Sequence, residues 1–211
     1  MVLKSDPILP SDERTRIIRK AQDLFFANGF TRVTTDEVAR ELGISKKTLY
    51  QHCASKDELL AAAVLLMREE LQAAVHAVVA DSKRDFVEKL HDLLVAVGSR
   101  MSRIQRPFFE ELPRKAPKVW AELEEFRREV IFREISQLIA QGSRRGMIRR
   151  DVDPQLFLQM FFITIHGVLR PETLVDMPFS AADVFRAILT IHMQGVLTEE
   201  ARARFIQENQ Q

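Results

Sequence analysis

Residues 43 to 58 read GISKKTLYQHCASKDE and gather hydrogen-bond donors on one short segment. Lys46 and Lys47 are adjacent cations, and Thr48, Tyr50 and His52 follow them closely. Lysine ammonium groups reach phosphate oxygens and guanine acceptors, while hydroxyl and imidazole groups reach phosphates. The segment therefore favours contact with double-stranded DNA, provided that these residues lie on a helix that enters the major groove.

The elements around this segment predict such a helix. Thr34 and Glu37 in TTDE form a capping-box pattern, so a short helix is expected to begin there and to end near Leu42. Gly43 suits a sharp turn, and Ser45 suits the cap of the next helix. Two short helices joined by a glycine turn are typical of a helix-turn-helix. A merely solvated polar face is the alternative for an isolated charged helix.

Apolar residues fall at spacings that would close a small core beneath the segment. They are Val38, Ala39, Leu42, Ile44 and Leu49, packing against Leu24 and Phe25 of a preceding helix. With these side chains buried, the polar residues from Lys46 to His52 are left on the outside. Because the cap, the turn and the core positions agree, we prefer the DNA-binding interpretation.

Residues 14 to 60, and above all AQDLFFANGFTRVTTDEVARELGISKKTLYQHCASKDELL, resemble the DNA-binding domain of the TetR/AcrR family of bacterial transcriptional regulators. The resemblance implies phosphate contacts at the start of the second helix and at the start of the fourth, with base or phosphate contacts between them. The predicted DNA-binding residues are Thr34, Thr35, Lys46, Lys47, Thr48, Tyr50, Gln51, His52 and Lys56. Lys47 stands where many relatives have glycine. Because a lysine adds a bulky cation at the groove, the operator sequence cannot be inferred from those of relatives.

Cys53 stands where relatives usually have phenylalanine, and it is the single cysteine of the chain. Oxidation of a thiol beside the predicted DNA-contacting helix could change how that helix sits on DNA and so act as a redox switch. The simpler interpretation is a small buried apolar residue. A single cysteine also excludes an internal disulfide. The absence of disulfides is typical of proteins in a reducing compartment.

Composition predicts an all-α globular protein. The chain has 211 residues, 46% of them hydrophobic, with 31 basic and 30 acidic residues, so no overall field attracts nucleic acid. Seven glycines and no sustained alternation argue against sheets. No signal peptide or membrane span is expected, so the predicted location is the cytoplasm, without membrane association.

We predict a helix-turn-helix domain at 11–57 and a helical effector-binding and dimerisation domain at 58–200. Flexible tails are expected at 1–10 and 201–211, and about nine helices are expected in total. The first helix is expected to begin at Pro10 and Ser11. The prolines from Pro107 to Pro117 are expected to interrupt the helical pattern.

Two late helices, at about 154–168 and 180–196, are apolar around much of their circumference. A four-helix bundle made of two helices from each chain would bury them, as the family resemblance also implies. The alternative is a wide core face within one chain. The predicted dimer residues are Phe157, Met160, Phe161, Ile165, Val184, Ile188 and Ile191.

The resemblance further implies a ligand cavity among the middle helices. Aromatic and apolar residues there predict a hydrophobic or aromatic effector, although each residue could equally be ordinary core. The predicted lining is Phe86, Leu90, His91, Leu94, Met101, Phe108, Phe109, Trp120 and Phe126, with His76 and His166 as further polar candidates. The expected protein is a dimeric repressor that the effector releases from a palindromic operator. The alternative is a ligand-independent repressor, or an activator that uses the same helix-turn-helix.

Enzyme chemistry is the rival class. Glu88 and His91 form one E-x-x-H pair, but a di-metal bundle needs a second such helix, and none occurs. No phosphate-binding glycine loop or zinc-protease motif is present. No catalytic residue, metal or cofactor is predicted. The expected partners are double-stranded DNA, a small-molecule effector and a second copy of the chain.

Overall fold

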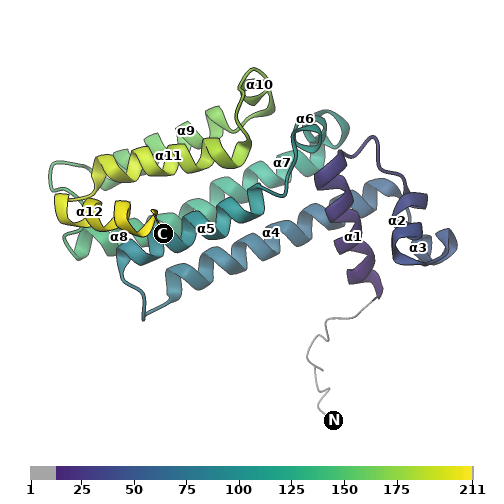
Figure 1. The fold of residues 1–211 in the computed structure, drawn as a ribbon, viewed down its shortest axis with the longest axis horizontal. Helices are drawn as coiled ribbons and strands as arrows, with labels where there is room; N and C mark the ends of the chain where they lie inside the picture. Colours follow the sequence, from purple (N-terminus) through teal and green to yellow (C-terminus); the bar gives the residue numbers. More distant parts are fainter. Residues whose placement is uncertain (1–12, 211) are drawn as a thin grey trace, which may run out of the picture.

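The computed structural model describes residues 13–210, and most of these residues are helical (Figure 1). The expectation of an all-α fold is confirmed. Within the described range, an isolated antiparallel bridge joins Ile148 to Leu197 and ties two interhelical connections together. The expected N-terminal tail, 1–10, and the expected helix start at Pro10 and Ser11 lie outside the described residues.

The N-terminal end of the molecule consists of α1 (Glu13–Asn28), α2 (Thr35–Leu42), α3 (Lys46–His52) and the first turns of α4 (Lys56–Ala80). Helices α2 and α3 form the predicted helix-turn-helix, called the reading head below. They lie together at one end of the elongated molecule (Figure 1).

Local signals fix the boundaries of the reading head. The Thr34 hydroxyl accepts from the amide of Glu37 at 3.1 Å, which is one of the two bonds of the predicted capping box. Gly43 has a φ of 68°, a left-handed conformation that favours glycine, and its N–H group bonds to the last carbonyls of α2. Ser45 accepts from the amide of Thr48 at 3.0 Å and caps α3. The short connection between the helices is therefore set by its own sequence.

The rest of the molecule is a longer helical bundle (Figure 1). Its helices are α5 (Phe86–Met101), α6 (Arg106–Lys115), α7 (Pro117–Phe126), the π-helical turn η1 (Arg127–Ile131), α8 (Phe132–Arg144), α9 (Pro154–Val168), α10 (Pro171–Leu174), α11 (Ala181–Val196) and α12 (Glu199–Glu208). Helix α4 packs against α1, α5, α7 and α8 and joins the two ends of the molecule.

The described residues contain more helices than expected, for local reasons. The segment expected as an interruption forms helix α6, with Pro107 in its first turn. A proline is tolerated there because the first amides of a helix have no intrahelical acceptor. The short helix α10, which begins at Pro171, was not expected either.

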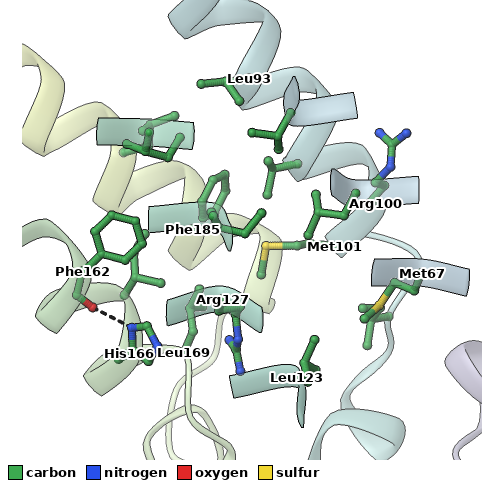
Figure 2. A pocket seen from close by; sticks show the side chains of 18 of the residues that line it. Met67, Leu93, Arg100, Met101, Leu123, Arg127, Phe162, His166, Leu169 and Phe185 are labelled. Carbon is green, nitrogen blue, oxygen red and sulfur yellow. Dashed lines mark hydrogen bonds between the residues drawn. The ribbon is translucent and has the colours of Figure 1, made fainter. Parts of the chain in front are cut away.

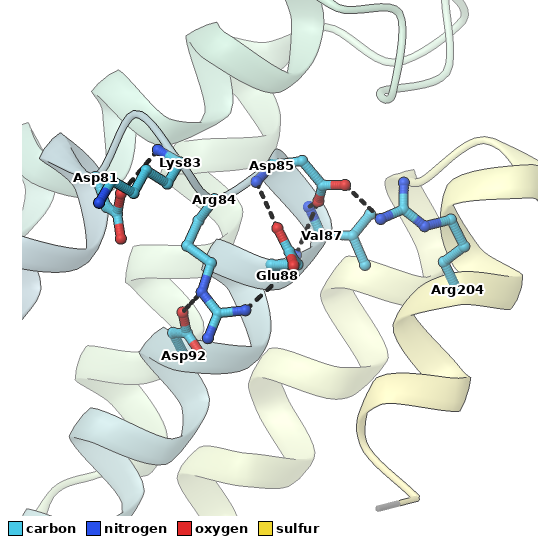
Figure 3. Close-up of polar contacts among 8 residues, drawn as sticks. All are labelled: Asp81, Lys83, Arg84, Asp85, Val87, Glu88, Asp92 and Arg204. Carbon is cyan, nitrogen blue, oxygen red and sulfur yellow. Dashed lines mark hydrogen bonds and ion pairs between the residues drawn. The ribbon is translucent and has the colours of Figure 1, made fainter.

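The prediction of a flexible tail at 201–211 is wrong for residues 201–208, which belong to α12. Ala201 and Phe205 are fully buried against the bundle, and α12 packs on α5. Arg204 pairs with the carboxylate of Asp85, which also caps α5 (Figure 3). Burial alone would raise the pKa of Asp85, but the bonds from Arg204 and from backbone amides lower it. The segment is mostly polar, so its composition did not indicate that Phe205 would be buried.

Phe205→Ala is expected to destabilise the protein by about 3–5 kcal/mol, because it leaves a cavity beneath α12. Urea unfolding followed by circular dichroism measures the change. Ile206→Ala is the matched control: this neighbour is partly exposed, so its loss should change stability by less than about 1 kcal/mol. Equal effects of the two substitutions would contradict a docked α12.

Two apolar cores share the molecule, and the predicted domain boundary at 57/58 falls within the first turns of α4. The N-terminal core includes Leu59 and Leu60 of α4 and also Phe108 of α6, whose ring lies 4.8 Å from that of Phe26. The bundle core lies between α4, α5, α8, α9, α11 and α12. The N-terminal core therefore extends beyond the range 11–57, and the division into two domains stays a prediction.

Candidate DNA-binding site and central cavity

The outer surface of α3 presents polar side chains over a single buried anchor. Leu49 is fully buried, whereas Lys46, Lys47 and Gln51 are exposed. The hydroxyl of Thr48 lies 2.8 Å from that of Ser45. This arrangement leaves α3 free to lie in a groove without disturbing the core beneath it.

Lys46 reaches back to the first turn of α2. Its ammonium group lies 2.9 Å from the carboxylate of Asp36, and the hydrogen bond and charge of Asp36 raise the pKa of Lys46 above its ordinary value. Lys46 is therefore a cation at neutral pH, already partly compensated by Asp36. Lys47 makes no ion pair within residues 13–210, so its charge is the freer of the two.

Thr35 has a different place from the one predicted. Its side chain is only 7% exposed in the reading head, and its hydroxyl lies 3.1 Å from that of Tyr50. The prediction of a phosphate contact from the Thr35 side chain is therefore not supported. Thr35 instead holds Tyr50, whose ring is 40% exposed on the outside of α3.

Thr35→Val is expected to weaken DNA binding by about three- to ten-fold, because it releases Tyr50 while preserving side-chain volume. The slope of affinity against salt should stay unchanged, since no cation is lost. Fluorescence anisotropy with labelled operator DNA measures both quantities. Tyr50→Phe serves as the reference: adding Thr35→Val to it should cause no further loss, and an additive loss would show that Thr35 acts independently.

The remaining predicted contacts flank α3. His52 lies 3.3 Å from the carboxylate of Glu13, and it is half-buried. Lys56 lies over the ring of Phe30 at 4.3 Å and donates weakly to the carbonyl of Thr31 at 3.4 Å. Burial lowers the pKa of Lys56, and the nearby carboxylate of Glu111 opposes this shift. Thr34, Tyr50, His52 and Lys56 thus border the exposed surface of α3.

Cys53 is fully buried in the N-terminal core. Burial raises the pKa of its thiol above the ordinary value, so little reactive thiolate forms at neutral pH. These observations favour the interpretation of Cys53 as a small core residue.

A cavity of about 140 Å³ lies within the bundle, and we call it the central cavity (Figure 2). Apolar side chains make up nearly all of its wall. The lining comprises Met67, Leu71, Val75, Leu93, Val97, Arg100, Met101, Ile104, Phe109, Leu123, Arg127, Ile131, Ile135, Phe161, Phe162, Ile165, His166, Leu169, Phe185 and Leu189.

Of the residues predicted to line a cavity, Met101 and Phe109 do so, as does the polar candidate His166. Five other predicted residues pack in the two cores and do not line this cavity. These are Phe86, Leu90, Leu94, Phe108 and Phe126. His91 instead bonds to Asn209 beyond α12, and Trp120 packs edge-on to Phe109 from outside the wall. His76 lies near Glu134 on another surface.

Arg127 is a lining residue that sequence reasoning missed. A signal was present, because Leu123, Arg127, Ile131 and Ile135 recur every fourth residue and place one arginine within an apolar stripe. All four line the central cavity. A cation at a core-facing position is unusual and points to a polar function or a buried partner.

The late helices α9 and α11 pack side by side (Figure 1), and both leave large apolar side chains exposed. These side chains, called the α9–α11 face, are Leu156, Met160, Ile163 and Ile191. Ile163 and Ile191 are 70% and 69% exposed, which is unusual for large aliphatic side chains.

Only Met160 and Ile191 of the predicted dimer residues belong to the α9–α11 face. Phe157, Phe161, Val184 and Ile188 are buried within one protomer, and Phe161 and Ile165 line the central cavity. The single chain therefore gives no support to their assignment to an interface, which stays a prediction. Leu156 and Ile163 were missed, because periodicity does not tell which side of an all-round apolar helix faces its own core.

Among residues 13–210, no group of three or more histidine, cysteine, aspartate or glutamate side chains is placed to hold a metal ion. In the same range, no helix is both long and apolar enough to cross a membrane. The two features that stand out are therefore the polar surface of the reading head and the apolar central cavity.

A helix-turn-helix at one end of an all-helical bundle defines a class of DNA-binding transcriptional regulators. Residues 17–63 match the family model described as bacterial regulatory proteins, tetR family. This match confirms the resemblance of residues 14–60 to TetR/AcrR-family transcriptional regulators. The relatives of the chain are regulators and not enzymes, which confirms the expectation that the chain is not an enzyme.

Relatives extend the likeness beyond the matched segment. The chain is 25% identical to the uncharacterized HTH-type transcriptional regulator YvaF of Bacillus subtilis, over 88% of this chain and 96% of that protein. It is 26% identical to a TetR/AcrR-family regulator of Thermobifida fusca, with a TM-score of 0.61 over 88% of this chain and 98% of that structure. A TetR-family regulator of Agrobacterium tumefaciens shares the fold, with a TM-score of 0.67 at 18% identity, over 90% of this chain and all of that structure.

Proposed function

We propose that the protein is a dimeric cytoplasmic repressor that binds a palindromic operator and leaves it when a small apolar effector fills the central cavity. One observation carries this proposal. Adjacent residues of α6 belong to the two functional regions, because Phe108 packs in the core beneath the reading head and Phe109 lines the central cavity.

The reading head supplies the DNA contacts of the proposal. Lys46, Lys47 and Gln51 are exposed on α3 and would face the major groove. Thr34, Tyr50, His52 and Lys56 border that surface and would contact phosphates, while Thr35 would position Tyr50. Thr48 would contact phosphate or base edges beside the cap of α3. The balanced charge of the whole chain makes this local surface decisive for affinity.

The α9–α11 face supplies the dimer contact. Its exposed aliphatic side chains lie on two helices that pack against each other, and a second copy of the same face would bury them in a four-helix bundle. The reading heads lie at the other end of each protomer (Figure 1). A symmetric pair of protomers would therefore present two reading heads to two half-sites of a palindrome.

Helix α6 would couple the cavity to the DNA-binding end. Just before α6, the amide of Gln105 donates to the carbonyl of Phe26 at the end of α1, at 2.8 Å. Within α6, Glu111 accepts from the amide of Thr31 at 2.7 Å. Because these bonds fasten α6 to the connection between α1 and α2, a ligand that shifts α6 would also shift the reading head.

Small apolar molecules are expected to raise the melting temperature and to weaken operator binding by about five- to one-hundred-fold, since the two effects are linked. A thermal-shift panel finds the ligands, and anisotropy with operator DNA measures the second effect. A ligand that stabilises the protein and leaves operator affinity unchanged would favour ligand-independent repression. Increased affinity would contradict release.

A further inference from the structure

The wall of the central cavity carries polar atoms without partners. Within residues 13–210, the Nε atom of Arg127 and the Nε2 atom of His166 are buried and make no hydrogen bond. Both side chains line the cavity, which is otherwise almost wholly apolar. Unpaired buried polar atoms are rare, because each loses its hydrogen bonds to water. Two at one cavity therefore point to a polar group that the cavity is built to receive.

The hydrogen bond at the other ring nitrogen defines what His166 offers. Its Nδ1 atom lies 3.0 Å from the carbonyl oxygen of Phe162 (Figure 2). A carbonyl only accepts, so Nδ1 carries the proton and donates. In neutral imidazole the other nitrogen, Nε2, is then an acceptor. His166 Nε2 is therefore an acceptor that lacks a hydrogen-bond donor.

Arg127 offers the opposite group. Its NH2 group pairs with the carboxylate of Glu124, and its guanidinium lies 5.2 Å from the ring of Trp120. The side chains of Arg127 and Glu124 are only 17% and 15% exposed, so they form a shielded pair with little net charge. The Nε–H group of Arg127 remains a free donor beside the cavity.

The local backbone supports a functional position for Arg127. The residue begins the π-helical turn η1, which also contributes Ile131 to the cavity wall. Single π-helical turns occur frequently at functional sites, where they change the direction of side chains within a helix. Arg127, at the start of this turn, is therefore an arginine in the otherwise apolar wall of the central cavity.

We propose that the effector is a small apolar molecule with one hydroxyl group, which accepts from Arg127 Nε and donates to His166 Nε2. This inference rests on the proposed function of the cavity as an effector site. A hydroxyl is both donor and acceptor, so a single oxygen would satisfy both buried atoms. The volume of about 140 Å³ is suited to a body near the size of one aromatic ring. Phenols and small cyclic alcohols are the chemical class.

A carboxylate fits this site less well. Glu124 already pairs with Arg127, so a carboxylate ligand would compete with Glu124 for the same guanidinium. The lone pair of His166 Nε2 would also face the carboxylate. Arg100, the other cation of the wall, lies on the side of the cavity away from His166 (Figure 2).

Calorimetry with three probes that share one ring tests the proposal: phenol, toluene and benzoate, at neutral pH. Phenol should bind about ten-fold more tightly than toluene or better, because only its hydroxyl satisfies the buried pair. Benzoate should bind more weakly than phenol. Equal affinities of phenol and toluene, or no binding of phenol, would overturn the proposal. Preference for benzoate would overturn it in favour of an anionic effector.

His166→Phe should abolish the preference for phenol over toluene while toluene still binds, which also shows that the cavity is intact. His192→Phe is the matched control, because His192 makes the same bond to the carbonyl of Ile188, at 2.8 Å, but does not line the cavity. It should keep the preference. Arg127→Lys, which keeps a charge for Glu124 but lacks the Nε–H group, should reduce the preference. Retention of the full preference in both His166→Phe and Arg127→Lys would overturn the assignment.

Operator binding separates this inference from the proposed function. If phenol binds with the expected preference and saturating phenol leaves operator affinity unchanged, the ligand site stands and regulation through it fails. If other apolar molecules release the DNA and phenol shows no preference, regulation stands and the hydroxyl site fails.

Discussion

The double substitution Ile163→Asp/Ile191→Asp is expected to convert the dimer into monomers and to weaken binding to a palindromic operator by about 10²- to 10⁴-fold. Both side chains are exposed on the α9–α11 face, so the protomer should stay folded. In a dimer, the carboxylates would be buried against apolar side chains and each other. A monomer keeps its reading head but loses the second half-site. Sedimentation velocity measures the mass, and anisotropy measures the affinity.

Val95→Asp/Leu65→Asp is the matched control, because these exposed apolar side chains lie on α5 and α4 and not on α9 or α11. It adds the same charge and should leave mass and affinity close to those of the wild type. A wild-type protein that sediments as a monomer would contradict the dimer proposal. So would an Ile163→Asp/Ile191→Asp variant that remains dimeric.

Lys46→Ala/Lys47→Ala should weaken operator binding by about ten- to one-hundred-fold and lower the slope of affinity against salt by between about one and two. The loss follows from two cations that no longer displace counterions from DNA. Lys47 should contribute more than Lys46, because Asp36 already compensates Lys46. Circular dichroism should show unchanged helix content, since both side chains are exposed.

Lys115→Ala/Lys118→Ala removes the same charge from exposed positions on α6 and α7 and serves as the control for general electrostatics. Its affinity for operator DNA should fall much less. Similar losses in the two double variants would show that overall charge, and not the reading head, controls binding. Wild-type affinity of the Lys46→Ala/Lys47→Ala variant would contradict the assignment of α3 to the groove.

The reading head could be predicted closely because its signals are local. The cap at Thr34, the turn at Gly43 and the cap at Ser45 each act within a few residues, and the structure has all three. The burial of the Thr35 side chain could not be predicted in this way. Its burial depends on Tyr50, fifteen residues away on the next helix, and no local pattern reports that contact.

The cavity and the exposed face were harder to predict, because they depend on how whole helices are rotated in the bundle. An apolar α9 is compatible with either side facing the core, so Phe161 and Ile163 could not be distinguished from periodicity alone. Phe108 and Phe109 are adjacent, yet one lies in the N-terminal core and the other in the cavity wall. The stripe that contains Arg127 was a further sequence signal for the polar residues of the cavity, besides the predicted candidate His166.

Selection of double-stranded DNA from a random pool, followed by sequencing of the retained fragments, tests the central claim most directly. A dimer with two reading heads predicts an enriched palindrome whose half-sites are centred about one helical turn apart, or at a related spacing. Its recovery should disappear with Lys46→Ala/Lys47→Ala. Retention of no common motif by the folded wild-type protein, or of single half-sites without symmetry, would contradict dimeric reading of the major groove.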